Sequence, residues 1–72
     1  MAIFKMIDQR FQIDGKGLAR GRAATGLNMS EFAYKCGWTC SYQWKLENDR
    51  VETVSEGTKN VMEGVLSWTK LG

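Results

Sequence analysis

The chain of 72 residues contains no histidine and no proline, has two cysteines, and includes no long hydrophobic run. Without histidine, acid–base catalysis would need other groups. The sequence offers no paired carboxylates, no nucleophile beside a base and no glycine-rich phosphate loop. A structural zinc site takes about four ligands, which two cysteines cannot supply. The sequence therefore predicts no catalytic residue, no metal and no cofactor, and we do not expect an enzyme.

The apolar segments are all shorter than the ~18 residues that a membrane-spanning helix requires. The charged residues Lys5, Asp8 and Arg10 interrupt the start of the chain, so this segment does not resemble a secretory signal. We therefore expect a cytoplasmic protein without a membrane partner.

The residues that are present favour one small folded domain over 1–72. Apolar residues make up 43% of the chain, and three of them are tryptophans. The net charge is +2, which is compatible with nucleic-acid binding without being diagnostic of it. A domain of this size has a core that only just offsets the entropy of ordering the chain, so it often gains stability from a partner.

Capping residues and hydrophobic spacing predict four helices. The first runs from about Lys16 to Thr25, with Asp14 as its N-cap and Gly26 ending it. The second begins at Asn28, where Asn28 and Glu31 form a capping-box pair, and ends at Gly37; the third runs from the Thr39 cap to about Asn48. After a loop over 50–54, Ser55 caps a fourth helix. Its inward positions are predicted to be Thr58, Val61, Met62, Val65, Leu66 and Trp68 or Leu71.

The N-terminal segment, residues 1–14, is expected to be extended. Its β-branched and aromatic content favours two short strands that turn near Asp8 and Gln9. A helix with Phe4, Ile7 and Phe11 on one face is the alternative. The predicted fold class is thus a mostly α, compact bundle of four helices with a short N-terminal β segment.

Residues 26–48 form the most informative passage, because they predict a short helix, a tight glycine turn and a second short helix. Two such helices that cross at about 90–120° form the helix-turn-helix arrangement that reads the DNA major groove. We expect Cys36 to be buried, Trp38 to fill the core at the turn, and the Cys40 thiol to face outward. Further core residues are predicted to be Leu18, Leu27, Phe32, Ala33, Val61, Met62 and Val65.

From Leu18 onward, about two-thirds of the chain resembles the Xre/Cro/C1-type helix-turn-helix family, which has the lambdoid phage repressor fold. The matching residues are Leu18, Arg22, Gly26-Leu27-Asn28, Glu31-Phe32-Ala33, Gly37, Thr39, Leu46-Glu47-Asn48 and Arg50. The resemblance implies a sequence-specific transcriptional regulator of a phage or mobile element that binds a double-stranded DNA operator as a homodimer. Repression would follow from occlusion of a promoter.

The resemblance also implies roles for individual residues. Arg22 and Glu47 would form an ion pair that ties the reading helix to the first helix. Lys45 would donate to guanine O6 and N7, and Cys40 would make an apolar contact, for instance with a thymine methyl. The implied base-reading residues are Thr39, Cys40, Ser41 and Lys45, and the implied phosphate and backbone contacts are Asn28, Arg22, Tyr42, Trp44, Asn48 and Arg50.

Three positions depart from the family pattern. Met29 stands where the family usually has a phosphate-binding glutamine. Gln43 replaces a buried aliphatic residue, so either the helix rotates to bury Trp44 or Gln43 hydrogen-bonds internally. The chain also ends before the family's fifth helix, which often forms the dimer interface. We therefore expect the N-terminal segment to pair with its twofold mate, with Phe4, Ile7, Phe11 and Trp68 at the interface.

Two other functions remain open from the sequence. The modest charge, Met29 and the aromatic residues Tyr42 and Trp44 also suit a protein-interaction module, such as an anti-activator or an inhibitor that binds RNA polymerase. An architectural protein that bends DNA is a third possibility.

Overall fold

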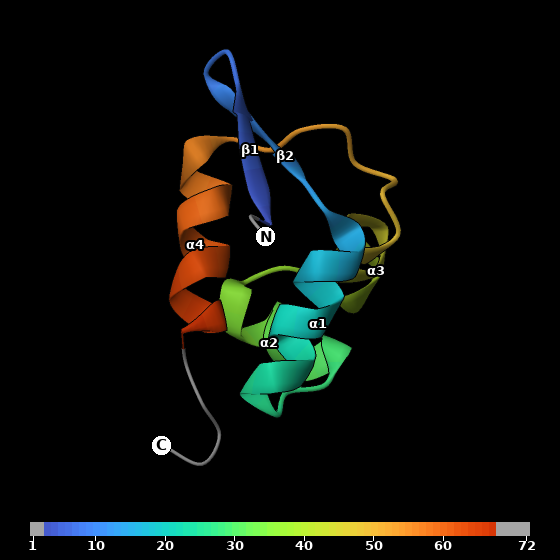
Figure 1. Ribbon diagram of the computed structural model, residues 1–72. Helices are drawn as coiled ribbons and strands as arrows, with labels where there is room; N and C mark the ends of the chain where they lie inside the picture. Colours follow the sequence, from blue (N-terminus) through green and yellow to red (C-terminus); the bar gives the residue numbers. More distant parts are fainter. Residues whose placement is uncertain (1–2, 68–72) are drawn as a thin grey trace.

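A computed structural model describes residues 3–67 of the chain (Figure 1). Two strands and four helices follow one another along this part of the chain. They are β1 (Phe4–Ile7), β2 (Arg10–Ile13), α1 (Gly15–Thr25), α2 (Met29–Cys36), α3 (Cys40–Glu47) and α4 (Glu56–Leu66). The protein is compact and mostly helical with a short N-terminal β segment, as the sequence predicts.

The N-terminal segment forms a β-hairpin, so the strand prediction is confirmed and the helical alternative is wrong. β1 and β2 are antiparallel, with Phe4 opposite Ile13, and the chain turns at Asp8, whose φ of 55° is left-handed. Phe11 of β2 also exchanges two backbone hydrogen bonds with Val54, at 2.9 and 2.8 Å. The hairpin is thereby anchored to the segment that precedes α4 (Figure 1).

Side-chain caps begin α2, α3 and α4 at the predicted residues. The Asn28 side chain accepts a hydrogen bond from the Glu31 backbone N–H, and the Glu31 carboxylate accepts one from the Asn28 N–H. At α3 and α4 only the cap side chain takes part: Thr39 accepts from the Tyr42 backbone N–H, and Ser55 accepts from the Thr58 backbone N–H.

Asp14 is the N-cap residue of α1, as predicted, but its side chain makes no cap hydrogen bond. The helix starts one residue earlier than predicted, at Gly15. The Gly15 N–H donates to the Asp49 carboxylate at 3.0 Å. A residue 34 positions later in the chain therefore supplies the acceptor for a backbone N–H at the start of the helix.

The hydrophobic core lies where the hairpin, α1, α2, α3 and α4 meet. Val61, predicted to be buried, is instead 40% exposed, because Met62 occupies the centre of the buried stripe of α4 and Val61 lies at its edge. Cys36 and Trp38 are half-buried and pack against the core. The predicted positions Trp68 and Leu71 lie outside the described residues. The buried apolar residues are Ile13, Leu18, Leu27, Phe32, Ala33, Leu46, Val54 and Met62.

We expect Gly15→Ala to destabilise the protein. A Cβ atom at this position would lie 2.5 Å from the Glu47 carbonyl oxygen, which is backbone at the end of α3 and cannot move aside cheaply. Such overpacking typically lowers the free energy of unfolding by about 1–3 kcal/mol. Urea denaturation measures the change. Gly64→Ala in α4 is the control, because its Cβ would meet no atom within 4 Å and should stabilise the helix by about 1 kcal/mol. A stable Gly15→Ala variant would contradict the close packing of α1 on α3.

Candidate functional site on α2 and α3

A tight glycine turn fixes how α3 follows α2. Gly37 has a left-handed φ of 90°, and its N–H donates to the Ala33 carbonyl at 2.9 Å. The Trp38 N–H donates to the same carbonyl at 3.0 Å, which closes the end of α2. Thr39 then caps α3, so two helices of eight residues each are separated by three residues.

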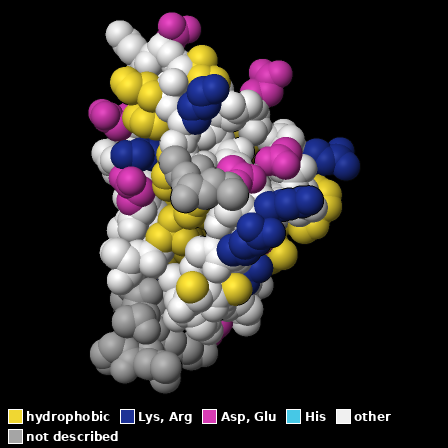
Figure 2. All heavy atoms as spheres, in the orientation of Figure 1, with side chains coloured by type: hydrophobic (Ala, Val, Ile, Leu, Met, Phe, Trp, Pro, Cys, Tyr) yellow, Lys and Arg dark blue, Asp and Glu magenta, His cyan; other side chains and the backbone are white. Residues whose placement is uncertain are grey.

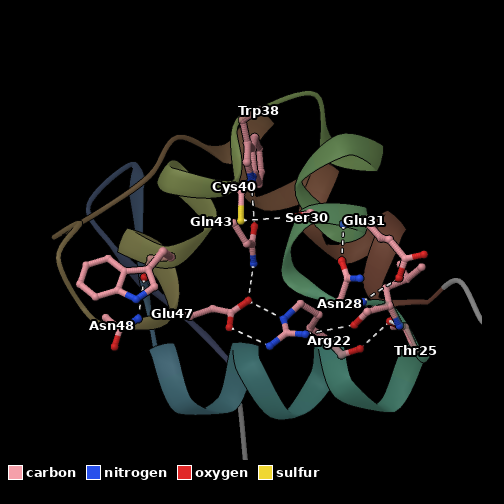
Figure 3. A network of polar contacts seen from close by, with 12 residues as sticks. Arg22, Thr25, Asn28, Ser30, Glu31, Trp38, Cys40, Gln43, Glu47 and Asn48 are labelled. Carbon is pink, nitrogen blue, oxygen red and sulfur yellow. Dashed lines mark hydrogen bonds and ion pairs between the residues drawn. The ribbon is translucent and has the colours of Figure 1, made fainter.

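A line of hydrogen bonds runs through the inner side of α3 (Figure 3). The Trp38 indole N–H donates to Gln43 Oε1 at 2.8 Å, and Gln43 Nε2 donates to Glu47 Oε2 at 2.8 Å. The Gln43 side chain is completely buried, whereas Trp44 is 45% exposed. Of the two alternatives for this helix, the internal hydrogen bond of Gln43 is therefore the one observed, and Trp44 does not enter the core.

Arg22 of α1 ends this line with the ion pair that the sequence predicts. Its Nε and Nη2 donate to the two carboxylate oxygens of Glu47, at 2.7 and 3.1 Å, and its Nη1 donates to the Leu27 carbonyl at 3.0 Å. The Arg22 and Glu47 side chains are 18% and 6% exposed. Because three of its five N–H groups are committed inside the protein, Arg22 acts mainly as a scaffold residue, and a phosphate contact would have to use the other two.

The outward side of α3 carries the residues predicted to read bases. Thr39, Cys40, Ser41 and Lys45 are all exposed. Three of them come together with two further residues around a shallow groove of about 330 Å³, whose lining is Met29, Cys40, Ser41, Trp44 and Lys45. Thr39 is not among the lining residues, and its hydroxyl oxygen accepts the capping hydrogen bond from the Tyr42 N–H at 3.1 Å.

The predicted phosphate contacts divide into engaged and accessible groups. Asn48 donates its side-chain amide to the Trp44 carbonyl at 2.9 Å, and Tyr42 packs edge-on against Trp38 with the ring centres 5.4 Å apart. Arg50 is exposed and lies over the Trp44 ring, 5.7 Å from its centre. An exposed cation thus lies beside the groove, whereas Asn48 and Tyr42 have structural contacts of their own.

Met29 and Ser30 are the residues of this region that the sequence reasoning missed. The family pattern marks Met29 as the loss of a phosphate ligand, yet its side chain lines the groove. The Ser30 hydroxyl donates to the Cys40 sulfur at 3.4 Å (Figure 3). The signal was the Asn28 cap, because it places Met29 and Ser30 in the first turn of α2, the turn that meets the start of α3.

Charge is distributed unevenly over the molecule. α1 carries Lys16, Arg20 and Arg22 and no acidic residue, whereas α4 carries Glu56, Glu63 and Lys59. In Figure 2 Lys and Arg side chains lie over α1 and on the side where α3 lies, and others lie toward the hairpin and α4, with Asp and Glu side chains among them. α1 therefore contributes positive charge without an acidic residue of its own, and the net charge of the chain is +2.

The two cysteines lie in different environments. Burial raises the pKa of the Cys36 thiol to about 11, so at neutral pH it is an uncharged part of the packing. Cys40 is exposed on α3. Over residues 3–67, no group of three His, Cys, Asp or Glu side chains could hold a metal ion.

No described helix is long and apolar enough to span a membrane. Comparisons with protein-family models, with curated proteins and with solved structures gave no match. The resemblance to the phage repressor family thus stays a prediction from the sequence.

Arg22→Ala should lower the free energy of unfolding by about 3–5 kcal/mol, because it leaves the Glu47 carboxylate buried without its cation. Thermal and urea denaturation measure the loss. Glu63→Ala is the control, since this carboxylate is 49% exposed in its ion pair with Lys59 and such surface pairs contribute about 0–1 kcal/mol. An unchanged melting temperature of Arg22→Ala would refute the role of the pair.

Proposed function

We propose that the protein is a sequence-specific DNA-binding transcriptional regulator that reads the major groove with residues 39–48. The observation that carries this proposal is the combination of an exposed α3 start with a fully hydrogen-bonded inner side. Cys40, Ser41 and Lys45 are accessible from outside, and Gln43 and Glu47 hold the same helix from within. A reading helix needs both properties, since base-edge contacts require a fixed orientation.

The dimensions of α3 suit this role. An α-helix with its side chains is about 10–12 Å across, so α3 fits the ~12 Å width of the B-DNA major groove. The groove lining contains one cation, Lys45, and no carboxylate among the described residues. Arg50 lies close by, and α1 adds further positive charge, so the electrostatics favour a polyanion.

Each residue has a defined task in this proposal. Lys45 donates to guanine O6 and N7, and Ser41 donates to or accepts from a neighbouring base. Arg50 and the side-chain NH2 group of Asn28 contact phosphates. These contacts position the protein without specifying sequence. Repression follows because a bound protein occludes the promoter. The lambda repressor-like fold, with α2 and α3 as its helix-turn-helix, is part of the same proposal.

A homodimer would place two reading helices on an operator with twofold symmetry. β1 pairs with β2 on one side and is the edge of the two-stranded sheet, and its Met6 and Ile7 are 65% and 40% exposed. Phe4 and Phe11, expected at the interface, instead pack partly against the core of their own chain. We therefore assign the dimer contact to the β1 edge with Met6 and Ile7. The fourth expected residue, Trp68, lies outside the described residues.

Sedimentation at tens of micromolar should give the mass of a dimer. Met6→Lys should shift the equilibrium toward monomer, because it replaces an exposed apolar side chain at the sheet edge by a charge. A monomer at this concentration overturns the assigned interface.

The second candidate is a protein-interaction module. It is favoured by the exposed aromatic side chains Tyr34 and Trp44, which are 86% and 45% accessible. Aromatic residues are frequent anchors of protein interfaces.

Selection of bound sequences from a random duplex pool at ~150 mM salt distinguishes the two candidates, because this salt weakens non-specific phosphate binding. Enrichment of an inverted repeat supports the dimeric regulator. Enrichment of a single unrepeated site supports sequence-specific DNA binding and contradicts the symmetric dimer. No enrichment by folded protein favours the interaction module.

On the selected operator, Lys45→Ala should cost about 1–3 kcal/mol and relax the preference at one base pair. Lys59→Ala removes the same charge from α4 and should leave both affinity and preference unchanged. The comparison is made by fluorescence anisotropy on duplexes that vary at each position. Equal weakening on all sequences would make Lys45 a phosphate contact instead.

A further inference from the structure

The shallow groove beside α3 has an unusual mixture of side chains for a surface that is proposed to read DNA. Its lining combines the thioether of Met29, the thiol of Cys40 and the indole of Trp44 with the hydroxyl of Ser41 and the ammonium of Lys45. Met29 comes from the first turn of α2, and the other four residues come from the first six positions of α3. Two helix starts therefore build one concave apolar surface with a polar rim.

The Cys40 sulfur is already engaged on the protein side, because it accepts the hydrogen bond from the Ser30 hydroxyl. Beside it stand a thioether and an aromatic ring, and neither donates a hydrogen bond from its apolar surface. A ligand in this groove therefore needs an apolar group for the lining and hydrogen-bond acceptors for Lys45. Arg50 over the Trp44 ring adds a second cation beside the groove, which favours a negatively charged ligand.

We propose that the groove seats the C5-methyl group of a thymine in each half-site, with Met29 and Cys40 as the specificity-determining residues. This inference rests on the proposed function, and it adds the class of base that the groove selects. Among the four bases, thymine alone presents a methyl group in the major groove. The thymine is adjacent to the guanine contacted by Lys45, since Lys45 lines the same groove as Met29 and Cys40.

The test uses the operator obtained by selection and replaces each thymine in turn by uracil, which pairs identically and lacks only the methyl group. At one position in each half-site, uracil should weaken binding about fourfold, the loss that corresponds to about 0.8 kcal/mol for one buried methyl group. All other thymines should tolerate the replacement. Fluorescence anisotropy at ~150 mM salt measures the affinities.

Variants assign the effect to the groove. Met29→Gln keeps the length of the side chain and should bind the thymine and uracil operators with equal affinity. Cys40→Ser should likewise reduce the ratio of the two affinities. Val61→Gln is the matched control, because this apolar side chain is 40% exposed on α4 and does not line the groove. Its ratio of affinities should equal that of the unaltered protein. Circular dichroism melting verifies that each variant is folded.

Three results would overturn the inference, and they can be told apart. Equal affinity for uracil at every position removes the methyl seat and leaves DNA reading intact. A uracil effect that persists unchanged in Met29→Gln and Cys40→Ser places the methyl contact elsewhere on the protein. Failure to select any DNA removes the inference together with the proposed function, and an apolar side chain of a protein partner is then the occupant of the groove.

Discussion

The carboxylate of Glu47 is the group on which the arrangement of the helices depends. It is almost completely buried, and it accepts hydrogen bonds from Arg22 of α1 and from Gln43 of its own helix (Figure 3). A buried charge is tolerated only when its partners are correctly placed, so this group requires α1 and α3 to keep one relative orientation. Gln43 extends the requirement to Trp38 in the turn between α2 and α3. Three parts of the fold therefore share one set of polar contacts, and no buried side-chain nitrogen or oxygen in residues 3–67 is left without a partner.

This arrangement favours a unique geometry over maximal stability. An aliphatic residue at position 43 would fill the same space by packing alone, and packing tolerates small rotations of a helix. A glutamine with a donor and an acceptor both engaged does not, because rotation would break either the contact with Trp38 or the contact with Glu47. Gly15 adds a second constraint, since the absence of its Cβ lets α1 approach the backbone at the end of α3. These inner contacts therefore fix the positions of the outward-facing residues of α3.

Much of this structure could be predicted from the sequence, and the exceptions have physical causes. The caps at Asn28, Thr39 and Ser55, the glycine turn and the Arg22–Glu47 pair follow from local spacing or from the family pattern. The side-chain hydrogen bond expected from the Asp14 cap is not observed, because the acceptor for the start of α1 comes from Asp49, 34 residues away from Gly15. Position 43 could be narrowed to two arrangements, but choosing between them needed the location of the Trp38 N–H. The groove could not be predicted, because the sequence pattern indicates only that Met29 lacks a phosphate-binding group. The concave surface that Met29 shares with α3 exists only after α2 and α3 have packed.

The bridge between Phe11 and Val54 has a consequence for the order of folding. Both α2–α3 and the hairpin are local in sequence, whereas the neighbouring contact of Arg10 with Thr53 joins residues 43 positions apart. A two-stranded hairpin is only marginally stable by itself in water. On the ribosome, at roughly 5–20 residues per second, its anchoring segment is synthesised about 2–9 s later. During that interval the hairpin lacks its hydrogen bonds with Thr53 and Val54, and closure of this long loop becomes a late step that completes the domain. The hairpin, although it is synthesised before the four helices, is thus among the last segments to join the folded domain.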